Sequence, residues 1–458
     1  MAERVARGCC RHGHLDRRGR ARRPANWACT NLYGEEVSGL PNEFTAVTIP
    51  SADAFNCPVG TPFACRTISL GGALTADRDW RGIDFAKVSS TIDLAGHSLQ
   101  TSAMSGLAGI AIVTDTIGGG ALHLSVPEGL VVSNSAVAFA GAMKLVKEGD
   151  GKFVAAKTGQ TYTGGTDVAG GVFALGGNGT ASVCGASGST NTVFAGAKLD
   201  CNGFGENWHN VFVLAGGTLR DPWCVADITL TADSSVEVVT SDHWALANGG
   251  YAEAMLEMNG HVLAFDVPSG KQCVLSNLKV TGGGKLQGRG EGYLRLGSDR
   301  DGTGVHAPGT ALEMHNALEV RYESTFLDYI SFYEGEYDLR PANPVRVAGR
   351  FCPAGDGVSW HSAELLDGAT LDLSHVTGVW SATCTGNHFE GASTLSFAPG
   401  ATITVEMGAR TPVRDDQLTA WNSTPAGVKF VWGRGLPLYA SCRGLFVKFA
   451  PGFIITIR

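Results

Sequence analysis

A short pattern recurs along this chain and limits the folds open to it more than any other feature. It runs from an apolar residue through an acidic residue and a small turn into a second apolar stretch, and residues 256–263 read Leu-Glu-Met-Asn-Gly-His-Val-Leu. Further copies begin at Ile92, Leu199, Leu312 and Leu371, and the first gap is close to twice the length of each later one. We interpret this as a degenerate repeat with a period of about 57 residues that covers two or three coils.

Each copy is typical of a short strand followed by a tight corner. Side chains alternate between the two faces of a strand, so Leu256 and Met258 are expected to point inward and Glu257 to point to solvent. Asn259 and Gly260 then supply the positive φ of a corner. Strands this short cannot bury a core alone, whereas coils stacked about 4.8 Å apart can.

Composition agrees with an all-β repeat protein. Gly accounts for 63 of 458 residues and charged residues for 17%, which favours turns and strands over helices. We therefore predict a parallel β-helix, or β-solenoid, that forms a single elongated body. The expected organisation is a basic disordered tail over residues 1–26, a solenoid body over residues 27–420, and a C-terminal cap of short strands over residues 421–458.

The N-terminal tail, residues 1–26, holds eight arginines, although the formal net charge of the whole chain is −8. A nucleic-acid arm or a zinc cluster could be read from the arginines and from Cys9, Cys10, His12 and His14. The spacing of these four residues fits no standard zinc pattern, and the rest of the chain is acidic. We therefore predict a disordered tail, no bound metal and no nucleic-acid partner.

The most specific segment is residues 144–177, KLVKEGDGKFVAAKTGQTYTGGTDVAGGVFALGG. It resembles the autotransporter-associated β-strand repeat, also called the passenger-associated transport repeat, which pairs a Lys-x-Gly-x-Gly strand with a Thr-Tyr-Thr-Gly-Gly-Thr turn. The likeness covers this segment, which is a small part of the chain. The residues that carry the motif are Lys147, Gly149, Gly151, Thr161, Tyr162, Thr163 and Thr166, with Gln160, Gly164, Gly165, Val168 and Leu175 also matching.

The resemblance implies a right-handed β-helix of the passenger type, located outside the cell or on the outer-membrane surface of a bacterium. The chain shows no apolar stretch near the ~18 residues of a membrane helix, so we predict no transmembrane segment. The corners of the repeat are assigned to glycines. These corner glycines are Gly96, Gly164, Gly165, Gly203 and Gly260.

Some β-helix proteins act on acidic polysaccharides, and this enzyme class is the alternative. Such a site needs several carboxylates that converge on one face. The candidate segments are residues 77–79 (Asp-Arg-Asp) and 299–302 (Asp-Arg-Asp-Gly), both more typical of solvated turns. His97, His261 and His375 recur at comparable places and are interpreted as structural residues that line corners. Six tryptophans near turns could pack locally or stack on sugars. They are Trp80, Trp208, Trp223, Trp244, Trp360 and Trp380.

From these features we predict a non-enzymatic structural or adhesive protein without catalytic residues or cofactors. The expected partners are surface glycans, or proteins of a host or of a neighbouring cell. A polysaccharide lyase or glycoside hydrolase built on a β-helix is the alternative function.

Overall fold

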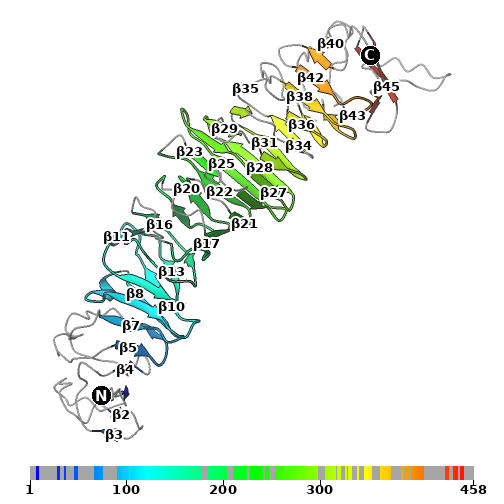
Figure 1. Cartoon of the computed structure of the whole chain (residues 1–458). Coiled ribbons are helices and arrows are strands. Elements are labelled where there is room, and N and C mark those ends of the chain that lie inside the picture. Colours follow the sequence, from blue (N-terminus) through cyan, green and yellow to red (C-terminus); the bar gives the residue numbers. More distant parts are fainter. Residues whose placement is uncertain are drawn as a thin grey trace. The chain divides into compact units, whose positions relative to one another are not determined.

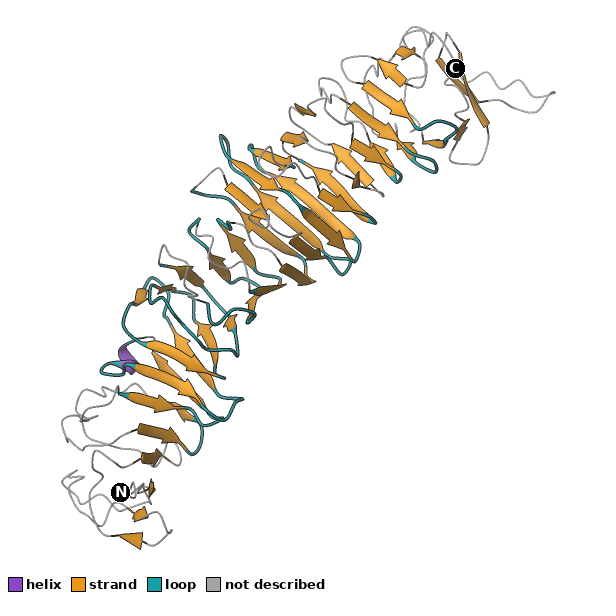
Figure 2. Cartoon of the chain, viewed as in Figure 1, coloured by secondary structure: helices purple, strands orange, loops and turns teal. Residues whose placement is uncertain are grey.

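The computed structural model describes the chain most fully between residues 90 and 315. Described are residues 67–75, 90–102, 104–176, 184–203, 210–223, 227–240, 254–297, 305–315, 345–352, 362–372 and 394–406, and beyond these only strands. The chain divides into two compact units, Met1–Leu219 and Arg220–Arg458. Nearly every regular element is a strand, and the one described helical segment is the 3-10 turn Ser105–Leu107 (Figure 2).

The first unit is built from three faces of stacked strands (Figure 1). One face contains β1 (Arg7–Cys9), β2 (Ala28–Thr30), β3 (Glu36–Val37), β4 (Ala46–Ile49), β5 (Thr67–Leu70), β7 (Thr91–Asp93), β9 (Ile112–Asp115) and β12 (Ala138–Gly141). A second contains β6 (Leu74–Thr75), β8 (Ser98–Ser102), β10 (Ala121–Ser125), β13 (Lys144–Glu148), β15 (Thr166–Val168), β17 (Thr190–Phe194) and β19 (Val211–Ala215). The third contains β11 (Val131–Asn134), β14 (Lys152–Ala155), β16 (Val172–Leu175), β18 (Lys198–Asp200) and β20 (Thr218–Arg220).

The second unit has the same construction. One face contains β21 (Asp227–Ala232), β24 (Ala254–Glu257), β27 (Leu278–Thr281), β30 (Val305–Ala307), β33 (Thr325–Phe326), β36 (Val345–Val347), β38 (Ser362–Leu365), β40 (Thr383–Thr385), β41 (His388–Glu390) and β42 (Thr394–Phe397). Another contains β22 (Ser234–Glu237), β25 (Val262–Asp266), β28 (Gly284–Arg289), β31 (Thr310–Met314), β34 (Tyr329–Phe332), β37 (Arg350–Cys352), β39 (Thr370–Asp372), β43 (Thr402–Glu406), β44 (Lys429–Trp432), β45 (Pro437–Ser441) and β46 (Gly444–Val447). A third contains β23 (His243–Leu246), β26 (Gln272–Leu275), β29 (Tyr293–Leu296), β32 (Ala317–Val320) and β35 (Asp338–Leu339).

Strands of consecutive coils pair in parallel and in register. Leu99 lies beside Leu122, and Leu122 lies beside Leu145, so one full coil separates each of these leucines from the next. Such a parallel pairing needs a crossover between its strands, and the other two faces of the coil supply it. The all-β class and the parallel stacking of a β-solenoid, both predicted from the sequence, are confirmed.

Alternation along the strands builds the core. In β10, Leu122 and Leu124 are buried while their neighbours are partly exposed, as the period of two requires. Because the coils are in register, like residues stack on like, and the rings of Phe153 and Phe173 lie 5.4 Å apart. Burial of these apolar columns is the main favourable contribution to folding.

The long period that the sequence pattern indicated has no single structural counterpart. The copies at Leu199 and Leu312 lie on β18 and β31, whereas the copy at Leu256 lies on β24, which belongs to a different face. The pattern marks a buried strand that enters a tight corner, and such a junction occurs on more than one face. The coil itself is shorter, and equivalent places in the successive coils from β10 to β19 belong to Leu122, Leu145, Thr166, Asn191 and Phe212.

The end of the second unit departs from parallel stacking. β43 and β44 are parallel, but β45 pairs with β44, and β46 with β45, in the antiparallel sense. The last parallel strand, β44, therefore pairs with an antiparallel strand and does not present a free parallel edge.

Candidate functional site

The corner glycines assigned from sequence fall into two physical kinds. Gly96, Gly165, Gly203 and Gly260 have φ between +71° and +81°, which is the left-handed region that glycine adopts without strain. Gly164 does not need such a φ. A Cβ on Gly164 would lie 2.4 Å from the carbonyl oxygen of Met143, so close approach of the preceding coil requires glycine there.

Lys147 of the repeat motif is fully buried and faces the interior of its coil. Its Nζ donates hydrogen bonds to the carbonyl oxygens of Glu148 (3.0 Å), Gly149 (2.7 Å) and Gly170 (2.8 Å). Burial lowers the pKa of Lys147 to about 8, against the opposite effect of the nearby Asp150 and Glu148 carboxylates. The three contacts satisfy carbonyls of two consecutive coils, which explains why the motif has lysine at this position.

The turn of the motif also directs a side chain into the core. Tyr162 is fully buried, its hydroxyl lies 2.6 Å from Thr166 Oγ1, and burial raises its pKa well above the ordinary value. The flanking Thr161 and Thr163 are exposed, and their backbone N–H groups bind carbonyls of the coil before. Gly149 has φ +72°, and a Cβ on Gly151 would lie 2.1 Å from the Pro127 carbonyl oxygen. All seven motif residues therefore make contacts within the stack.

Buried carboxylates at corners are a feature that the sequence pattern did not single out. Asp115 accepts backbone N–H groups of Gly96 (2.9 Å), Ile117 (3.3 Å), Gly118 (3.1 Å) and Gly120 (2.7 Å). Burial raises the pKa of Asp115, but these four hydrogen bonds outweigh that effect and lower it overall. The signal available in the sequence was an aspartate at the end of a strand and just before a glycine run.

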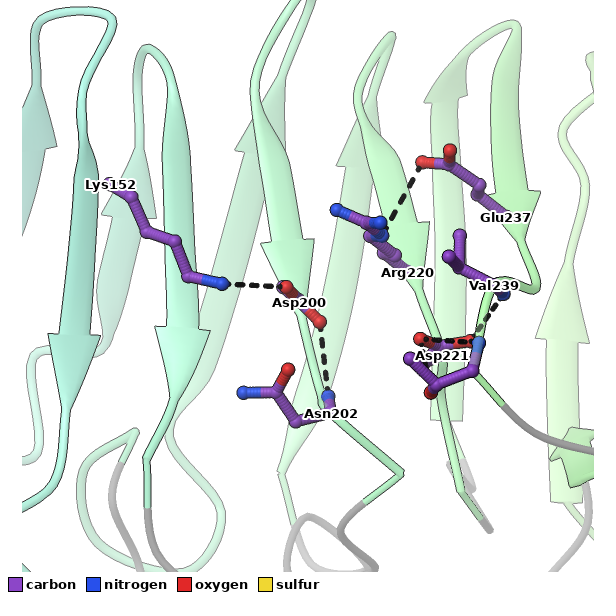
Figure 3. A network of polar contacts seen from close by, with 8 residues as sticks. Lys152, Asp200, Asn202, Arg220, Asp221, Glu237 and Val239 are labelled. Atoms are coloured by element: carbon purple, nitrogen blue, oxygen red, sulfur yellow. Dashed lines mark hydrogen bonds and ion pairs between the residues drawn. The ribbon is translucent and has the colours of Figure 1, made fainter. Parts of the chain in front are cut away.

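Figure 3 shows comparable contacts in each unit. In the first unit, Lys152 Nζ lies 3.2 Å from Asp200 Oδ2, and Asp200 Oδ1 accepts the N–H of Asn202 at 3.1 Å. In the second unit, Asp221 accepts the N–H of Val239 at 2.6 Å. The Lys152–Asp200 contact spans two coil spacings, because β16 lies between β14 and β18, and the contacts of Asn202 and Val239 close corners.

A further polar group lies on β28 and at the end of β31 in the second unit. The Glu313 carboxylate accepts hydrogen bonds from Lys285 Nζ (2.8 Å) and Gln287 Nε2 and lies 2.8 Å from His315 Nε2. Burial raises the pKa of Glu313, but the contacts with Lys285, His315 and Gln287 outweigh it and lower the pKa to about 2. Glu313 is therefore ionised at every ordinary pH, which does not suit a general acid.

A second group on the same face also consists of paired charges. Arg350 of β37 donates to Asp372 of β39 at 2.8 Å and to Glu406 of β43. These two carboxylates raise the pKa of Arg350 above its ordinary value, against the effect of burial. One guanidinium thus links three consecutive strands.

The histidines thought to line corners do so where they are described. His97 and His261 each follow a tight corner, and their N–H groups donate to Leu94 and Met258 carbonyls, both at 2.9 Å. His375, the residues 77–79 and 299–302, and the side chains of Trp80, Trp208, Trp244, Trp360 and Trp380 lie outside the described residues. Trp223 is partly exposed.

No group of three His, Cys, Asp or Glu side chains that could hold a metal ion occurs in the described part of the chain. The same residues contain no helix with the length and apolarity needed to cross a bilayer. Comparison with protein-family models, with curated proteins and with solved structures finds no match to this chain.

Proposed function

We propose that this chain is a non-enzymatic, structural or adhesive β-solenoid that is secreted by a bacterium or held on its surface. The observation that carries the proposal is the use of its charged side chains. Lys147, Glu313 and Arg350 each bind groups of a neighbouring coil. Polar groups committed in this way hold the stack together and are not available to bind or transform a substrate.

The finer features of the proposal come from the motif over residues 144–177. We propose three such features. The β-helix is right-handed, the chain belongs to the autotransporter-associated repeat family, and it is located outside the cell or on the outer membrane. The contacts of Lys147, Tyr162 and Gly165 support this proposal, because they give each motif residue a role in coil stacking. Surface glycans, or proteins of a host or neighbouring cell, are the proposed partners.

The alternative is a polysaccharide-active enzyme, and one observation favours it. The carboxylate of Glu313 contacts both His315 and Lys285 on one strand face, and such residue types perform acid–base chemistry. These contacts engage both carboxylate oxygens, which is why we place this function second.

One experiment separates the two proposals. The purified chain and its Glu313→Gln variant are incubated with acidic polysaccharides, and new reducing ends and unsaturated products are measured, alongside adhesion of coated beads to bacterial and host cells. We expect no turnover by either protein, and adhesion that survives the substitution. Turnover that is lost in Glu313→Gln, with folding intact, would overturn the structural proposal.

A further inference from the structure

We infer that residues 119–155 and 260–296 are two copies of one five-strand module that runs through parts of two consecutive coils, with one copy in each compact unit. The segments align without a gap when residue 119 is placed on residue 260, and 11 of the 37 aligned positions are identical. In this alignment β10, β11 and β14 coincide in both bounds with β25, β26 and β29. β12 and β13 coincide with β27 and β28 to within one position at each end.

The two copies share the same corner hydrogen bonds. In the first, Gly151 N–H donates to Val126 O (2.9 Å) and Lys152 N–H donates to Leu130 O (2.8 Å). In the second, Gly292 N–H donates to Val267 O (2.9 Å) and Tyr293 N–H donates to Lys271 O (2.9 Å). In both units, therefore, a Val-Pro-x-Gly corner of one coil accepts backbone hydrogen bonds from the Gly-acid-Gly corner of the next coil.

The same glycines are required for the same reason in each copy. A Cβ on Gly149 would lie 2.5 Å from Val126 O, and one on Gly290 would lie 2.3 Å from Val267 O. A Cβ on Gly151 would lie 2.1 Å from Pro127 O, and one on Gly292 would lie 2.4 Å from Pro268 O. Real Cβ atoms do not approach a carbonyl oxygen this closely.

A shared lysine completes the likeness on the outer face. Lys144 Nζ lies 2.9 Å from Asp167 Oδ2, and Lys285 Nζ lies 2.8 Å from Glu313 Oε2. In both cases the carboxylate belongs to the following coil. It lies beside the residue two places after the lysine, since Val146 pairs with Asp167 and Gln287 pairs with Glu313.

General solenoid geometry does not account for these shared features. The corner at residues 169–171 reads Ala-Gly-Gly and the corner at residues 195–197 reads Ala-Gly-Ala, so neither contains the proline or the spaced glycine pair. Both corners nevertheless join strands of the same parallel stack. The module is therefore a specific unit that occurs twice, and this inference does not depend on the proposed function.

Exchange of the modules tests the inference. One variant of the full chain carries the sequence of residues 260–296 in place of 119–155, and a matched control carries residues 264–300, which has the same length but corners out of register. Far-ultraviolet circular dichroism and limited proteolysis are measured on both. We expect the in-register graft to keep its β signal and protease resistance, and the shifted graft to be cleaved in the first unit.

A second experiment tests the inference with single substitutions and does not need a grafted segment. Gly151→Ala and Gly292→Ala are compared by hydrogen exchange in their own coils. We expect the loss of amide protection in the two coils to agree within about tenfold. Equal behaviour of the two grafts, or a strong effect of one glycine with none of the other, would overturn the inference.

Discussion

The two modules keep the same corners but fill their interiors differently. Lys147 of the first lies in register between Leu124 and Val168, and its ammonium binds three carbonyls. The equivalent position of the second is Gly288, which lies between Phe265 and Met314, and both of these side chains are fully buried. A small residue at this position thus lies in register between two large apolar ones. The two modules therefore share the backbone geometry of their corners more strictly than the residues of their interiors. The stack of side chains inside the coils can be filled by different residue types.

The largest effect is expected at the corner glycines that the modules share. Gly151→Ala and Gly292→Ala each force a Cβ against a backbone carbonyl oxygen, so each should cost roughly 2–4 kcal/mol of unfolding free energy. Gly129→Ala and Gly270→Ala are the controls at the facing corners, because an added Cβ there has nothing within 4 Å and meets only the strain of a positive φ. They should cost only about 1 kcal/mol. Urea unfolding measures all four, and equal costs in both pairs would contradict the close-approach explanation.

Lys147 should stabilise the corners beside it through hydrogen bonds that its counterpart Gly288 cannot make. Lys147→Met keeps much of the apolar stem but removes the ammonium donor from the carbonyl oxygens of Gly149 and Gly170, whereas that of Glu148 keeps the N–H of Val126. The substitution should cost about 1–3 kcal/mol. Gly288→Met is the matched change, and it should destabilise by overpacking against Phe265 and Met314. Hydrogen exchange of the corners at residues 148–151 and 169–171 distinguishes them, since only Lys147→Met should speed exchange there. Unchanged exchange would show that the ammonium is not needed.

The carboxylate that binds the shared lysine of the second module makes stability depend on pH. The folded pKa of Glu313 is about 2, below its ordinary value of 4.5, so the unfolded chain binds more protons between these values. The stability that Glu313 contributes is therefore complete above pH 4.5 and is lost as pH falls toward 2. Glu313→Gln should lower the free energy of unfolding by about 1–2 kcal/mol at pH 7 and by little near pH 2. Urea unfolding across this pH range measures it, and a difference that is constant with pH would exclude this origin.

The smallest effect is expected at the exposed prolines of the two corners. Pro127→Ala and Pro268→Ala remove no buried side chain and act mainly by increasing the freedom of the unfolded chain, so each should cost about 0.4–1 kcal/mol. The two costs should agree within error in thermal unfolding. A cost near that of Gly151→Ala at either proline would show that the corners are not equivalent.

Fold class could be predicted because it depends on features that recur locally. A buried strand followed by a positive-φ corner recurs, and Gly96, Gly165, Gly203 and Gly260 have the φ that such corners need. Gly164 could not be separated from Gly165 by sequence, because its requirement comes from a backbone carbonyl of the preceding coil.

The polar contacts were harder to predict. Lysine is almost never fully buried, so nothing in the residue type of Lys147 indicates its position inside the coil. The partners of Asp115, Glu313 and Arg350 depend on register between coils of variable length, which a single sequence does not reveal. The duplicated module is hard to recognise in the sequence because its identical positions are mostly glycines and apolar residues, scattered among common residue types.

The central claim is that each coil contacts mainly its neighbours in a parallel stack, and hydrogen exchange of a Gly165→Val variant tests it most directly. The new side chain would meet the carbonyl oxygen of Thr190, because even a Cβ at Gly165 would lie 1.9 Å from that atom. Damage in a stack of coils stays local. The account predicts faster exchange for amides around residues 145–200 and little change near residue 370. Uniform loosening of the whole chain would contradict it.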